Sequence, residues 1–159
     1  MRPGPLTVVV PQRVRYGPGV ALAELLARID ELGGEEAYPV VPVDLFFAGN
    51  DDPASIGPNL EPHPGMDTFA RVLRGIRDRD EVSDVVLQVS EVLPGDEWPF
   101  VDAAYVLTTA SPEEVHEWAR ELEPDEYVED EPRSWPQGSP PPGAPPVPAG
   151  HRVVTLFWD

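Results

Sequence analysis

Apolar residues recur at helical spacing in three stretches of the chain. Between residues 20 and 32 they fall at every third or fourth position, and Gly33-Gly34 follows as a stop signal. Residues 66–79 repeat the pattern, with an acid near the start and arginines near the end, as the helix dipole favours. The third stretch opens on Ser111-Pro112-Glu113-Glu114, which supplies an N-cap, a proline at the first helical position and a capping box. The pattern therefore predicts three helices.

The other apolar runs are rich in β-branched and aromatic residues and predict about five strands, at 6–10, 38–48, 83–93, 101–109 and 152–158. The third and fourth runs flank a turn-forming segment, which indicates an antiparallel hairpin. In the second run, Pro39 and Pro42 restrict the first half to a sheet edge or bulge, so the pattern predicts a regular strand only from Val43 to Phe47. The last run is apolar on both faces, as is typical of an interior strand.

This order of elements indicates an α+β fold with an antiparallel or mixed sheet of about five strands and three helices. After a leading β-α unit, the order is βαββαβ, which is the ferredoxin-like, or split-βαβ, order with helices on one face of the sheet. A mixed sheet with helices on both faces is the alternative. The length of 159 residues fits a single domain over residues 1–159.

Residues 129–150 contain eight prolines and predict an extended crossover between the last helix and the last strand. The spacing Pro142-x-x-Pro145 within this segment offers an alternative, a ligand for an SH3-like groove. The stiff crossover is the favoured interpretation.

Charge restricts the possible partners of the protein. The chain has twenty-nine Asp and Glu but only eleven basic residues, all of them Arg, which gives a formal charge of −18. Such a field repels DNA, RNA and anionic lipid headgroups, so neither nucleic acid nor a membrane surface is expected as a partner. A basic protein remains a possible partner. The alternative is that the acids only keep the surface solvated.

Several chemistries are excluded by missing residues and motifs. The chain has no Cys and no Lys, which removes thiolate metal sites, cysteine nucleophiles and P-loop chemistry. The apolar run near the N-terminus is too short for a signal peptide, and no run approaches the ~20 residues of a membrane span. We therefore expect a cytoplasmic protein without a cofactor.

The long loop at 49–65 concentrates the residues with the most specific chemistry. Asp51, Asp52, Glu61 and His63 could bind a divalent cation or supply a carboxylate for acid–base catalysis. Their spacing matches no calcium or zinc motif. The favoured interpretation is a stiff surface loop with Asn and Asp as turn formers.

These observations favour a non-enzymatic acidic module, of the inhibitor or immunity type, that docks on a basic protein. Trp98 is either an exposed anchor for a partner or a packed residue, and packing is favoured. The alternative function is a small cation-dependent enzyme or metal-binding protein centred on the loop at 49–65. No catalytic residue is predicted, and the oligomeric state stays open. The predicted partner contacts are Asn50, Asp51, Asp52, Glu61, Trp98, Glu129 and Asp130.

Overall fold

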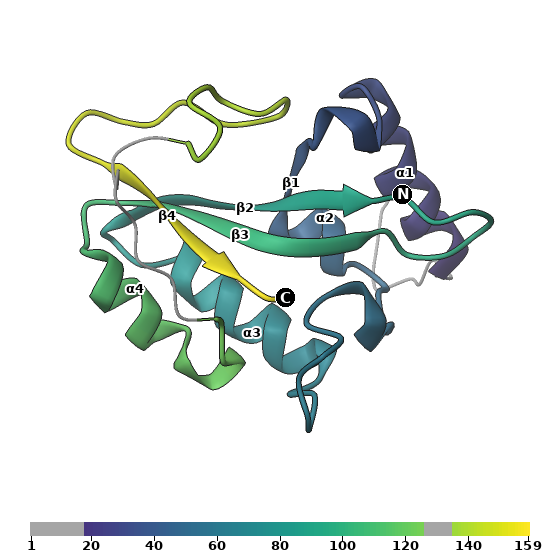
Figure 1. The fold of residues 1–159 in the computed structure, drawn as a ribbon, viewed down its shortest axis with the longest axis horizontal. Coiled ribbons are helices and arrows are strands. Elements are labelled where there is room, and N and C mark those ends of the chain that lie inside the picture. Colours follow the sequence, from purple (N-terminus) through teal and green to yellow (C-terminus); the bar gives the residue numbers. More distant parts are fainter. Residues whose placement is uncertain (1–17, 126–134) are drawn as a thin grey trace, which may run out of the picture.

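A computed structural model describes residues 18–125 and 135–159. In these ranges the chain forms an α+β fold with one antiparallel sheet of four strands. Helices lie against one face of the sheet, and a segment without helix or strand, residues 135–150, crosses the other face (Figure 1). We call this segment the strap. The strand expected at residues 6–10 lies outside the described residues.

The described residues form four α-helices, four strands and three short 3-10 helices. In chain order they are α1 (Pro18–Glu31), η1 (Glu35–Ala37), β1 (Val40–Pro42), α2 (Val43–Phe47), η2 (Pro53–Ser55), α3 (Met66–Arg77), β2 (Val82–Glu91), β3 (Phe100–Thr108), α4 (Pro112–Trp118), η3 (Arg120–Leu122) and β4 (Arg152–Phe157). None of these helices is long and apolar enough to cross a bilayer.

The strongest sequence signals are confirmed. The three predicted helices are α1, α3 and α4, and the predicted hairpin is the antiparallel pair β2–β3. The capping box is also present, because the Ser111 hydroxyl accepts from the backbone N–H of Glu114 while the Glu114 carboxylate accepts from the N–H of Ser111. Local capping and hydrophobic period agree at these positions, so local sequence determines the element.

The strand predicted at Val43–Phe47 is wrong, because these residues form α2. β1 ends at Pro42, whose extended backbone (ψ 152°) caps the helix. Val43, Phe46 and Phe47 are buried, and their spacing of three and four residues suits one helical face as well as an apolar strand. A short apolar run does not distinguish the two periods.

The ferredoxin-like arrangement also differs from the observed sheet. A split-βαβ unit needs parallel strands on either side of its helix, but β1 and β2, which flank α3, are antiparallel neighbours. The observed order is β1-β2-β3-β4, each strand pairing with the next along the chain. β4 is therefore an edge strand and not the interior strand that its apolar character predicted.

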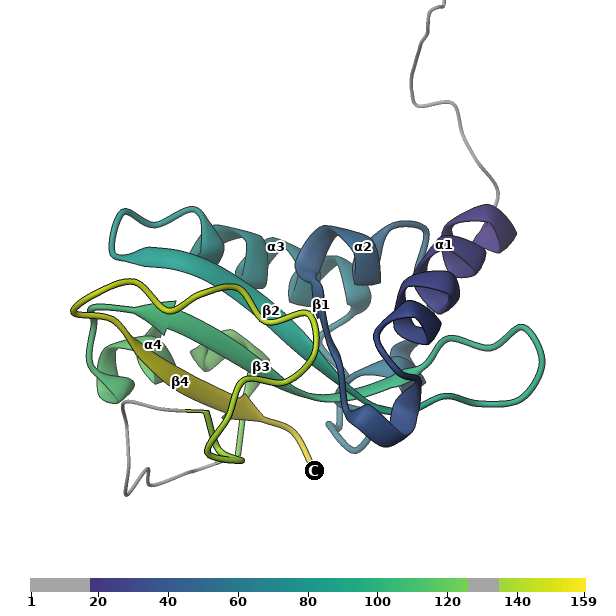
Figure 2. The ribbon, with the colours of Figure 1, turned by 90° about the horizontal axis from the view of Figure 1, so that it is seen from above.

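β4 is apolar on both faces because the sheet is covered on both sides. Val154 and Leu156 belong to the main core, which lies between the sheet and the helices. Val153 faces a smaller apolar cluster on the opposite side, where Trp135 of the strap packs edge-on against Tyr105 at 5.3 Å. Figure 2 shows the strap crossing the strands on this side.

The strap is fastened to β1 at its turn. The backbone N–H of Val40 donates to the carbonyl of Pro142 at 2.9 Å. Gly143 next to it has a φ of +88°, and a Cβ there would lie 2.5 Å from the Val40 carbonyl oxygen. Both the backbone angle and the close approach require glycine at this position.

Candidate functional site

Three side chains organise the first half of the loop at 49–65. Asn50 is buried, and its amide donates to the Phe46 carbonyl and to the Ser55 hydroxyl, at 3.3 and 3.1 Å. Its oxygen accepts from the N–H of Asp52 at 3.0 Å, and the Asp52 carboxylate in turn accepts from the N–H of Ala54 at 2.9 Å. Asn50 and Asp52 therefore act as turn formers, as the loop composition predicted.

His63 holds the second half of the loop through both ring nitrogens. Nδ1 accepts from the backbone N–H of Gly65 at 2.9 Å, so the proton must reside on Nε2, which donates to the carbonyl of Ile56 at 2.8 Å. The ring also packs against Phe69 of α3, with the centroids 5.4 Å apart. The imidazole thus joins the loop to the start of α3 and leaves no lone pair for a metal.

The structure does not bring the four candidate metal ligands together. Within residues 18–125 and 135–159, no three His, Asp or Glu side chains form a group that could hold a metal ion. Asp51 and Glu61 are exposed, Asp52 caps η2, and both nitrogens of His63 are occupied. The loop therefore presents two exposed carboxylates, and its other polar groups bind its own backbone.

The remaining candidates divide between buried and undescribed positions. Trp98 is buried with 7% of its surface exposed and belongs to the main core, which agrees with the packing interpretation. Glu129 and Asp130 lie outside the described residues. His116 on α4 bonds to the Pro112 carbonyl through Nδ1, and its buried Nε2 has no hydrogen-bond partner.

The folded body carries the whole charge imbalance of the chain. The described residues include 25 Asp and Glu and seven Arg, a difference equal to the formal charge of −18. Six of these seven arginines form ion pairs with acids of the same chain, as Arg71 does with Glu121 at 2.6 Å. Few cations of the described body are therefore left to neutralise a phosphate backbone.

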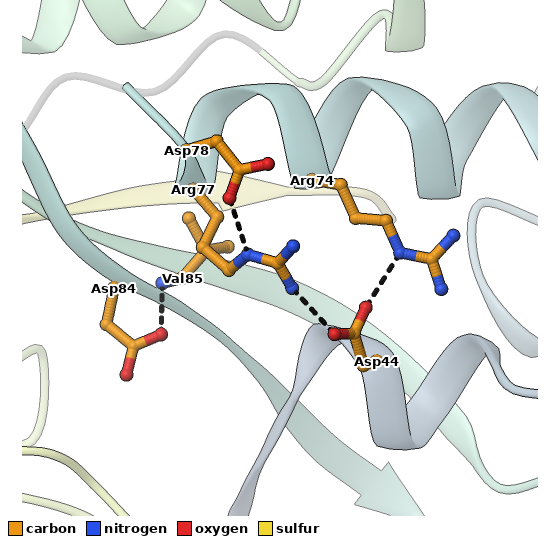
Figure 3. Close-up of polar contacts among 6 residues, drawn as sticks. All are labelled: Asp44, Arg74, Arg77, Asp78, Asp84 and Val85. Carbon is orange, nitrogen blue, oxygen red and sulfur yellow. Dashed lines mark hydrogen bonds and ion pairs between the residues drawn. The ribbon is translucent and has the colours of Figure 1, made fainter. Parts of the chain in front are cut away.

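The largest ion-paired group of the described residues joins α2 to α3 (Figure 3). The Asp44 carboxylate forms ion pairs with the guanidinium groups of Arg74 at 2.7 Å and Arg77 at 3.1 Å. Arg77 also pairs with Asp78 at 3.1 Å. The hydrogen bond from Arg74 is the main cause that lowers the pKa of Asp44. Burial lowers the pKa of Arg77, but the bonds to Asp78 and Asp44 outweigh burial and raise it. Sequence reasoning missed this group because Asp44 lies 30 residues or more before both of its arginine partners, and because the pattern of α2 also suits a strand.

Asp102 is a second charged residue that sequence reasoning missed. It lies in β3 where the pairing with β2 shifts register, since Gln88 faces Ala103 but Val89 faces Val101. The extra residue is a β-bulge, and bulges redirect side chains. Asp102 is half-buried, and this burial raises its pKa. An acid within an otherwise apolar strand was the available signal.

Comparison with known proteins relates most of the described body to one family. The family described as "Uncharacterized protein YfbO family" matches residues 20–156. The "Uncharacterized protein YfbO" of Escherichia coli (strain K12) is 33% identical over 126 residues, which cover 76% of this chain and 83% of that protein. No solved structure matches the chain. The match spans the loop at 49–65, the sheet and the strap, and this chain belongs to the YfbO family.

Proposed function

We propose that this protein is a non-enzymatic module whose acidic exterior docks on a basic protein. The observation that carries the proposal is the location of the charge: the described body alone has an excess of 18 carboxylates over arginines. A rigid surface of one sign accelerates the encounter with a partner of opposite sign and rejects partners of like sign.

The polar side chains support binding over catalysis. His63 and Ser55 are the side chains of the loop at 49–65 whose chemistry would suit a base and a nucleophile. His63 uses both ring nitrogens in bonds to the backbone, and the Ser55 hydroxyl donates to the Asp52 carbonyl at 2.7 Å while it accepts from Asn50. These groups are engaged in holding the loop, and a catalytic base needs a free lone pair near its substrate.

The contact surface that we assign to the partner includes the exposed carboxylates of the loop, Asp51 and Glu61. Asn50 supports this surface from within, because its buried amide bonds to the Phe46 carbonyl and the Ser55 hydroxyl. Trp98 is buried in the main core. The loop is rigid enough to present its acids in fixed positions, since Asn50, Asp52 and His63 bond to its backbone. A preorganised loop loses little entropy on binding.

Affinity capture on the immobilised full chain tests this proposal. Extract of the native cells is applied at about 50 mM salt and eluted at about 500 mM, because screening shortens the reach of exposed charges. The expected eluate contains a basic protein in stoichiometric amount, and calorimetry with that protein then measures the affinity at both salt concentrations. A partner bound equally well at both concentrations contradicts the proposal.

Paired neutralising variants locate the surface. D51N/E61Q removes two charges from the loop, and E24Q/D30N removes two exposed charges from α1 as a matched control. We expect the loop variant to weaken binding by about tenfold and the control to change it by less than about threefold. Equal losses in the two variants would show that the loop is not the contact surface.

A further inference from the structure

The strap is an uncharged surface on a strongly acidic protein. Residues 135–150 contain no Asp, Glu, Arg or His, although the chain has a formal charge of −18. The strap lies on the face of the sheet opposite α3 and α4, as both views show (Figures 1 and 2). A partner that docks there would not have to remove water from carboxylates, which is costly when no counter-charge is supplied.

Proline holds residues 144–148 in an extended conformation. Each of the three prolines in this stretch fixes its own φ and disfavours the α region for the residue before it. Polyproline II, the conformation that such a proline run favours, has about three residues per turn. Ala144 and Val147, three residues apart, pack against the cluster on the sheet, Pro145 is half-buried, and Pro146 and Pro148 are exposed.

A turn separates this stretch from the rest of the strap. The N–H of Ala144 donates to the Pro141 carbonyl at 3.1 Å, and Gly143 between them has a positive φ. The spacing Pro142-x-x-Pro145 therefore spans a turn and does not form a continuous polyproline helix. The spacing that lies within the extended stretch is Pro145-x-x-Pro148.

The extended stretch is fixed at both ends. The carbonyl of Pro142, within the turn, accepts from the N–H of Val40 at 2.9 Å, and the carbonyl of Pro148 accepts from the N–H of His151 at 3.0 Å. Val147 anchors the middle on the sheet. The ordering entropy of this segment has thus been lost on folding, which lowers the cost of binding.

We infer that residues 144–148 are a docking ridge for a partner domain with an aromatic-lined groove of the kind that binds polyproline II segments. Aromatic rings pack on the exposed faces of Pro146 and Pro148, while Ala144 and Val147 stay on the sheet. This inference does not depend on the acidic module proposed above, because it concerns an uncharged surface.

Titration of the 15N-labelled full chain with recombinant SH3 and WW domains, followed by NMR, tests the ridge. The amides of Ala144, Val147 and Ala149 report on the strap, since proline itself has no N–H. We expect at least one domain to shift these amides saturably while the amides of α3 stay in place. We also expect the dissociation constant to change less than about threefold between about 50 and 500 mM salt, because no carboxylate takes part.

Two substitutions at exposed prolines complete the test. P146A/P148A should weaken binding by about tenfold, and P94A, which changes an exposed proline in the β2–β3 turn, should leave it unchanged. P146E alone places a charge on the ridge and should also abolish binding. This single variant is the test to use if P146A/P148A melts below the parent chain. The inference is overturned if no domain shifts the strap amides at about millimolar concentration, or if P94A weakens binding as much as the ridge variants.

Discussion

Nδ1 of His63 accepts the backbone N–H of Gly65, the residue that precedes α3, at 2.9 Å. Because Nε2 bonds to Ile56 at the same time, one imidazole joins three points of the chain within ten residues of sequence. The ring therefore sets where α3 begins relative to the loop.

Replacement of His63 by alanine should destabilise the fold by about 1–3 kcal/mol, since it leaves a carbonyl and an N–H without partners. Urea denaturation followed by tryptophan fluorescence measures this loss. H151A is the matched control, because His151 makes one bond of 3.3 Å to its own turn, and it should cost less than about 0.5 kcal/mol. Equal costs would contradict the assigned role of His63.

Divalent cations should leave the melting temperature unchanged. A specific cation that binds only the native state raises the midpoint by mass action. Asp51, Asp52, Glu61 and His63 do not form a group, so thermal melts with Mg²⁺, Ca²⁺, Mn²⁺ or Zn²⁺ should coincide with the melt in chelator. A saturable upward shift that the H63A variant loses would revive the metal-binding alternative.

Asp44 should contribute stability at neutral pH that is lost in acid. Its pKa is lowered in the folded state, so its contribution is complete above the usual pKa of 3.8 and disappears as the pH falls through the lower folded value. The carboxylate is exposed, and D44N should therefore cost only about 0.5–1 kcal/mol at pH 7 in low salt. Denaturation curves from pH 7 to pH 2 should show the difference between D44N and the parent chain vanishing at the acid end.

Asp102 should show the opposite dependence. Burial raises its folded pKa above 3.8, so between these two values the native state binds more protons than the unfolded chain, and stability attributable to this group rises as the pH falls. D102N should therefore increase the free energy of unfolding at pH 7, but by less than about 1 kcal/mol, because solvent screens the half-buried carboxylate. The gain should shrink toward pH 3.8 on the same denaturation curves, and a gain that is constant with pH would point to another cause.

Alanine at Gly143 should loosen the strap. The added Cβ would lie 2.5 Å from the Val40 carbonyl oxygen, and the φ of +88° is unfavourable for any L side chain. We expect a loss of about 2–3 kcal/mol and greater quenching of tryptophan fluorescence by acrylamide as Trp135 becomes exposed. G138A shares the positive φ (+83°) but has open space around its Cβ, so it should cost about 1 kcal/mol.

The sequence predicts best those elements whose signals are local. The capping box at Ser111 and the helical period of α3 are local, and both were predicted correctly. The strand predicted at Val43–Phe47 was wrong because its apolar residues fit both the helical and the strand period. The end of β1 at Pro42 decides between the two. Trp135 lay in a segment whose composition favours extended chain, so its packing on Tyr105 was not visible before the sheet was assembled.

In the candidate site, too, the local contacts could be predicted and the long-range contacts could not. Composition correctly marked Asn50 and Asp52 as turn formers, because three of the four bonds described for their side chains are to backbone groups within four residues. The engagement of His63 depends on a contact with Ile56 seven residues away, and the pairing of Asp44 with Arg74 spans 30 residues. Interactions over such distances depend on how elements pack, which spacing alone does not give.

The bond between Val40 and Pro142 has a consequence for self-association. The carbonyl of Pro39 faces β2, where it accepts from Val89, so the alternation of a strand places the nitrogens of residues 40 and 42 on the outer edge of β1. The first nitrogen is already bonded to the strap, and the second belongs to a proline and has no hydrogen. This side of the sheet therefore offers no donor to a strand from a neighbouring molecule, and the protein is guarded there against edge-to-edge polymerisation.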